Sequence, residues 1–153
     1  MKAKPTAVPD LLEELLARPV AARQHFVRNV RRYWNPSFCR ALLDQSHTIR
    51  YSDPYEMARI AYLGVLVAER CSPLDDQLLA EAWTQLASGL MVRGALRSSD
   101  KAFSRAAEFL MQASIAAKLR WIECLASLRL RQARLKEARD LIGDVLRYRA
   151  HCG

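Results

Sequence analysis

The cysteines and histidines are the side chains of this sequence that could bind a metal ion or act as nucleophiles. They are Cys39, Cys71, Cys124, Cys152, His25, His47 and His151. They lie far apart, and neither the CxxC spacing of zinc sites nor the HExxH spacing of zinc proteases occurs. A GxSxG turn and a glycine-rich phosphate loop are also absent from the sequence. We therefore expect free thiols, no metal, no cofactor and no catalytic residues, which argues against an enzyme.

The segment RQHFVRNVRRYW, residues 23–34, is the second candidate for chemistry because it interleaves arginines with aromatic residues. Its arginines Arg28, Arg31 and Arg32 fall on one helix face, and its aromatic residues are Phe26, Tyr33 and Trp34. With a net charge of +8, this pattern suits contact with a nucleic-acid backbone and stacking on bases. In the other interpretation, the aromatic residues pack on the next helices while the arginines face water. No recognised nucleic-acid-binding motif accompanies the segment, so nucleic acid is the alternative partner.

The composition indicates a folded, helical protein. Hydrophobic residues make up 51% of the 153 residues, and there are only 5 glycines and 6 prolines, which argues against disorder. Alanine, leucine, arginine and glutamate dominate, and these residues favour helices. No apolar run approaches the roughly 18 residues that span a bilayer, and no secretory signal is recognisable. We expect a cytoplasmic protein without a membrane segment.

Proline and polar residues divide the chain into about eight predicted helices with short turns. Asn35-Pro36 and Asp53-Pro54 each combine an N-cap residue with proline at the first helical position. Ser72-Pro73 gives the same signal and predicts a helix that continues to about Arg93. The other helices are predicted at 9–16, 19–33, 98–113, 115–132 and 135–149. No alternation with period two indicates a strand, so the predicted class is all-α.

The segment from Ala80 to Ala106 combines small and large residues at regular spacing. The small residues Ala87, Ser99 and Ala106 would let two helices approach closely. The large residues Trp83, Leu86, Leu90, Leu96 and Phe103 would fill the seam between them. Gly94 stands between the two helices and can adopt the left-handed conformation of a turn. This segment resembles the tetratricopeptide repeat, a helix-turn-helix unit of about 34 residues.

Two further copies fit the same pattern with departures. In the copy at about 119–152, Ala133 replaces the turn glycine and Arg129 occupies an apolar position. The copy at about 38–71 fits poorly, because Asp44 and Gln45 occupy packing positions. With the best copy at 80–113, residues 35–153 are predicted to form one domain of repeats, with the helices of 1–34 as a cap. The chain is also similar in general appearance to bacterial proteins of unknown role that are built from divergent repeats. The alternative is an ordinary helical bundle whose spacing matches by accident.

The resemblance implies a right-handed α-solenoid that binds a peptide or a partner domain on its concave face. In such repeats the first helix of each pair lines that face, which implies a set of contact residues here. They are Glu81, Thr84, Ser88, Met91, Arg120, Glu123, Ser127 and Arg131. The arginines would suit an acidic segment, because guanidinium groups pair with carboxylates. The expected function is that of an adaptor or regulatory scaffold, and the alternative is that these are simply solvated helix positions.

The last predicted helix has apolar residues on more than one side. They are Leu141, Ile142, Val145, Leu146 and Tyr148. Terminal repeats normally present a polar outer face, so this pattern predicts that the end of the array is covered by something else. The chain is then expected to be a fragment of a longer array or to form a homo-oligomer through this end.

Overall fold

The computed structural model describes residues 6–152, and this part of the chain contains eight α-helices, a short 3₁₀ helix and no strand. The predicted all-α class is confirmed for these residues, while the first five residues of the predicted cap at 1–34 lie outside them. The α-helices are α1 (Val8–Leu16), α2 (Val20–Asn29), α3 (Pro36–Thr48), α4 (Pro54–Ala68), α5 (Asp76–Val92), α6 (Leu96–Ala107), α7 (Ile115–Arg131) and α8 (Leu135–Cys152). The 3₁₀ helix η1 (Arg31–Tyr33) follows α2.

Two of the predicted helix starts are confirmed by their cap hydrogen bonds. The side-chain oxygen of Asn35 accepts from the backbone N–H of Phe38 at 2.7 Å, and Asp53 accepts from Glu56 at 2.9 Å. Each cap is followed by proline, which has no N–H that would lack a helical partner. These starts therefore follow directly from the local sequence.

The helix start predicted at Ser72-Pro73 is wrong. Helix α5 begins at Asp76, and Asp75 is its cap, with an oxygen 3.2 Å from the backbone nitrogen of Leu78. An aspartate at the cap adds a charge that interacts favourably with the positive end of the helix dipole. The exposed segment before Asp75 instead connects α4 to α5.

Two other predicted helices are shorter than expected. The helix predicted at 19–33 ends at Asn29, because Val30 is extended and Tyr33 turns into the core, where it is fully buried. The helix predicted at 98–113 is α6, which begins at Leu96 and ends at Ala107. Single hydrogen-bonded turns then lead to Ser114, whose hydroxyl caps α7.

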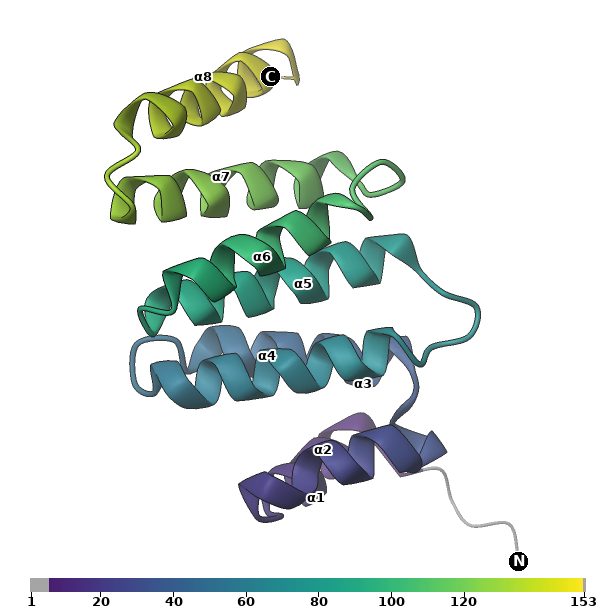
Figure 1. Ribbon diagram of the computed structural model, residues 1–153. Helices are drawn as coiled ribbons and strands as arrows, with labels where there is room; N and C mark the ends of the chain where they lie inside the picture. The colour runs from purple at the N-terminus through teal and green to yellow at the C-terminus, as the bar shows by residue number, and fades with distance from the viewer. Residues whose placement is uncertain (1–5, 153) are drawn as a thin grey trace, which may run out of the picture.

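The helices form four hairpins that lie one beside the next, as Figure 1 shows. The hairpins are α1/α2, α3/α4, α5/α6 and α7/α8. The first helix of each hairpin contacts the first helix of the next, and α4 and α6 also contact the hairpin that follows them. The windows 38–71, 80–113 and 119–152 therefore each correspond to one hairpin. Their identity as tetratricopeptide repeats stays a prediction.

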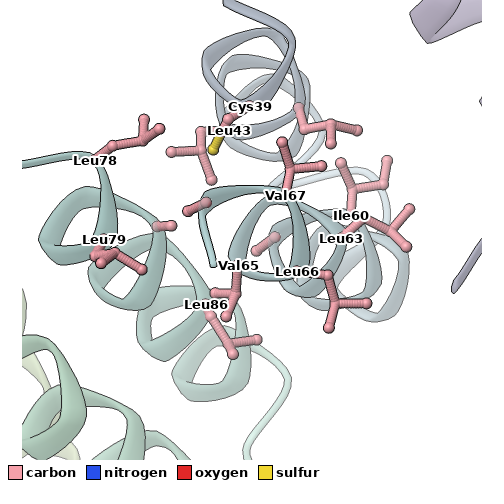
Figure 2. Packing of buried hydrophobic residues seen from close by; sticks show 14 of the residues in the cluster. Cys39, Leu43, Ile60, Leu63, Val65, Leu66, Val67, Leu78, Leu79 and Leu86 are labelled. Atoms are coloured by element: carbon pink, nitrogen blue, oxygen red, sulfur yellow. The ribbon is translucent and has the colours of Figure 1, made fainter. Parts of the chain in front are cut away.

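The centre of the hydrophobic core lies where α3, α4 and α5 meet (Figure 2). Leu43 of α3, Val65 of α4 and Leu86 of α5 are among its buried side chains. Helix α4 approaches α5 closely at Gly89, where an added Cβ would lie 2.9 Å from the Cα of Ala58. A side chain at this position would collide with backbone, so glycine permits the contact. This packing fixes the surfaces on which the functional residues stand.

Candidate binding grooves

A groove crosses the first helices of three successive hairpins and has a volume of about 310 Å³. We call it the central groove. Its lining residues are Leu43, Asp44 and His47 of α3, Glu81 and Gln85 of α5, Ser114 before α7, and Ala116, Ala117 and Arg120 of α7. The groove forms because α3, α5 and α7 lie side by side. Two of the predicted contact residues, Glu81 and Arg120, lie within it.

A chain of hydrogen bonds forms the polar floor of the central groove. Arg120 donates to the amide oxygen of Gln85 at 2.7 Å, and the Gln85 nitrogen donates to the hydroxyl of Ser46 at 3.0 Å. Ser46 in turn donates to the backbone carbonyl of Met57 at 2.9 Å. Gln85 and Ser46 are buried, so these bonds satisfy groups that would otherwise destabilise the fold. The network connects α7, α5, α3 and α4 and holds the Arg120 guanidinium at a fixed place.

The central groove is lined by acidic and basic side chains, and Arg120 is the cation whose charge is available to a ligand. Within residues 6–152, Arg120 forms no ion pair, and its hydrogen bond goes to a neutral amide. Glu81 accepts a hydrogen bond from Gln77. Burial lowers the pKa of His47 below its usual value, the charges of Arg50 and Arg120 lower it further, and Asp44 opposes them. The lowered pKa favours the neutral form of His47.

This geometry is suited to binding an anion. A guanidinium with unused donors can bind a carboxylate through two parallel hydrogen bonds. Within residues 6–152, no three His, Cys, Asp or Glu side chains are grouped to hold a metal ion. The four cysteines are free, and burial raises the pKa of the Cys39 thiol to about 12, which suppresses its nucleophilicity.

Three of the predicted contact residues are not on the surface. Thr84, Ser88 and Met91 are only 2%, 7% and 7% exposed, so they are not available to a partner. The reason is that α5 contacts α3, α4, α6 and α7, which together cover most of its circumference. Only the turn of α5 that carries Glu81 and Gln85 reaches the groove.

The other predicted contact residues lie at the far end of the molecule. Glu123 and Ser127 line a second groove, of about 240 Å³, between α7 and α8. We call it the end groove. Its other lining residues are Ala126, Leu130, Ile142, Val145, Leu146 and Arg149. Arg131 is exposed at the last residue of α7 and lines neither groove.

The aromatic residues of the basic segment 23–34 are engaged in packing. Tyr33 is fully buried, and the indole N–H of Trp34 donates to the carbonyl of Val27 at 2.7 Å. Arg32 pairs with Glu14, and Arg28 donates to the hydroxyl of Tyr62 at 3.2 Å. Arg31 is exposed. Tyr33 is thus unavailable for base stacking, and Trp34 is partly covered, which weakens the nucleic-acid interpretation of this segment.

The contribution of α3 to the central groove was missed in the sequence. Asp44 and His47 stand one turn apart on α3 and face the groove. The signal was present, because polar residues interrupt the apolar face of this helix at 44–47. Asp44 and Gln45 occupy packing positions of the repeat spacing, so the pattern indicates a poor copy rather than a polar strip beside a binding surface.

Comparisons of the chain with protein-family models, with curated proteins and with solved structures found no match. The resemblance to tetratricopeptide repeats therefore depends on the residue spacing alone. Within residues 6–152, none of the helices combines the length and apolar character needed to cross a bilayer.

Proposed function

We propose that the protein is a cytoplasmic adaptor or scaffold whose helix pairs form a right-handed solenoid of tetratricopeptide-like repeats. The pattern of contacts supports this architecture, since each first helix packs on the first helix of the following hairpin. The central groove then lies along the row of first helices, where such arrays present their ligand-binding face.

We propose further that this groove binds an extended segment of a partner protein through a carboxylate. The observation that carries the proposal is the Arg120 guanidinium, which stands on a buried polar network and has no carboxylate partner in residues 6–152. Such preorganisation favours affinity, because little side-chain entropy is lost when the anion binds. Asp44 and Glu81 add acceptors for backbone N–H groups or for a basic residue of the same segment.

The test is a quantitative pull-down from cell extract with wild type, Arg120→Glu and Arg131→Glu. Arg131 is the matched control, because it is an exposed arginine of the same helix that lies outside the central groove. We expect Arg120→Glu to abolish recovery of at least one partner that wild type retains, and Arg131→Glu to leave the recovery of that partner unchanged. A Gln85→Leu variant, which keeps the charge of Arg120 but removes its support, should weaken recovery less.

Equal recovery by wild type and Arg120→Glu would overturn the proposal. Thermal unfolding of each variant shows whether a loss reflects binding or misfolding. Arg120→Glu also removes the hydrogen bond to the buried amide oxygen of Gln85, so its unfolding temperature should fall, and the pull-down is run well below that temperature.

A further inference from the structure

The end groove is an apolar surface that the hairpin α7/α8 leaves uncovered. Leu130 is 50% exposed, Ile142 43% and Leu146 62%. On α8, exposed residues recur every three or four positions on one face, at Leu135, Arg139, Ile142, Leu146 and Arg149. Exposed aliphatic side chains that line a groove mark interaction surfaces more often than isolated ones do.

The preceding hairpin shows what shape fits such a groove. In the repeat spacing, Glu123 of α7 corresponds to Thr84 of α5, and Ser127 corresponds to Ser88. Ile142 of α8 corresponds to Phe103 of α6. The α5/α6 residues are buried, and α7 contacts both α5 and α6. The indole N–H of Trp121 in α7 donates to the carbonyl of Phe103 at 3.0 Å. An α-helix therefore fills this position one hairpin earlier.

Charge indicates which kind of helix fits the end groove. Arg139 lies on the same face of α8 as Ile142 and Leu146, and Arg149 lines the groove. The acid that lines the groove, Glu123, is already paired with Arg149. The surroundings of the groove are thus basic, which favours an acidic partner.

The same charges disfavour a second copy of the chain. If two α8 helices packed antiparallel through Ile142 and Leu146, Arg139 of one copy would face Arg149 of the other. Like charges placed together at an interface are destabilising. We propose that the end groove docks an amphipathic helix of a partner protein, with leucine-like residues at i, i+3 or i+4, and i+7, and with glutamates or aspartates beside them. This site is separate from the central groove.

Fluorescence anisotropy with designed peptides tests the proposal. The probe is a labelled helical peptide with leucines at these positions and flanking glutamates, and its control has lysine in place of each glutamate. We expect the acidic peptide to bind, and Leu146→Asp to weaken it at least about tenfold. Arg139→Glu combined with Arg149→Glu should reverse the preference in favour of the lysine peptide.

Two controls keep the result interpretable. Leu74→Asp replaces an exposed leucine outside the end groove and should bind like wild type. Arg120→Glu should also bind the acidic peptide like wild type. The proposal for the central groove and the proposal for the end groove can therefore fail independently. Circular dichroism checks that Leu146→Asp remains helical, as its exposure predicts.

Three results would overturn the proposal. The first is equal binding of the acidic and lysine peptides, and the second is binding that Leu146→Asp does not change. The third is a dimer by light scattering that Leu146→Asp converts to a monomer, because a second copy would then occupy the groove.

Discussion

Hairpins α5/α6 and α7/α8 have turns of the same geometry, but they differ in how much of their surface is buried. In the first, the N–H of Gly94 bonds the carbonyl of Met91, and that of Ala95 bonds Leu90. Ala133 and Arg134 make the corresponding bonds in the second hairpin. The first hairpin nevertheless has eleven buried residues in α5 and four in α6, whereas the second has four in α7 and two in α8. The local sequence therefore determines the hairpin, and the neighbouring hairpins determine which of its residues form the core.

The largest expected difference between the hairpins comes from two matched core positions. Phe103 in α6 is fully buried. Ile142 occupies the corresponding position of the repeat spacing in α8, but it is partly exposed. We expect Phe103→Ala to lower the free energy of unfolding by about 3–5 kcal/mol, through lost burial and a cavity. Ile142→Ala should lower it by about 1 kcal/mol or less, because little packing is lost and alanine favours the helix.

Urea denaturation of both variants measures this difference. The slopes with denaturant must match that of wild type for the two free energies to be comparable. Similar losses in the two variants would mean that the end groove is buried in solution, and the distinction between the hairpins would then be wrong.

The sequence predicted the hairpins more successfully than it predicted the surfaces. Asn35 and Asp53 marked helix starts because a cap and a following proline act within one turn of the chain. The side chains of Thr84 and Ser88 were misplaced, since their exposure depends on the helices that pack around α5, some of them distant in sequence. Arg129 shows the same limit, because ion pairs with Asp100 of α6 and Glu137 of α8 accommodate it at an apolar position.

The central groove was only half predicted for a related reason. Glu81 and Arg120 were found because the repeat spacing places them on first helices. His47 and Gln85 were not predicted, because His47 belongs to a hairpin with a weak pattern and Gln85 is not at a contact position of the repeat spacing. A buried glutamine becomes understandable only when its partners, Ser46 and Arg120, are placed beside it. Such polar networks depend on contacts that no local spacing encodes.

Two glycines give the next largest contrast between the interior and the end of the molecule. At Gly89 in α5 an added Cβ would lie 2.9 Å from the Cα of Ala58, so we expect Gly89→Ala to destabilise the fold by about 1–3 kcal/mol. At Gly143 in α8 the nearest atom would be 3.9 Å away, on the flexible side chain of Arg147. Gly143→Ala should stabilise by about 0.5–1 kcal/mol, because alanine favours the helix.

Thermal unfolding followed by circular dichroism measures both changes in the same buffer. The opposite signs are the essential result, since both substitutions add one methyl group to a helix. A stabilising Gly89→Ala would show that α4 and α5 can separate without loss, contrary to the close approach in the core.

The smallest expected effect concerns the turns of the two hairpins, which have the same geometry. Gly94 has φ +88° and Ala133 has φ 59°, so both occupy the left-handed region, where only glycine is unstrained. Ala133→Gly should stabilise α7/α8 by about 0.5–1 kcal/mol, because relief of this strain exceeds the greater chain entropy of glycine in the unfolded state. Gly94→Ala should destabilise by about 1 kcal/mol, since no neighbouring atom obstructs its methyl group and backbone strain alone opposes it.

Denaturation curves that show mirror-image shifts for the two variants would demonstrate that the hairpins share one turn geometry. If Ala133→Gly instead destabilised the protein, the turn of α7/α8 would not be left-handed at Ala133, and the two hairpins would differ in local structure as well as in burial.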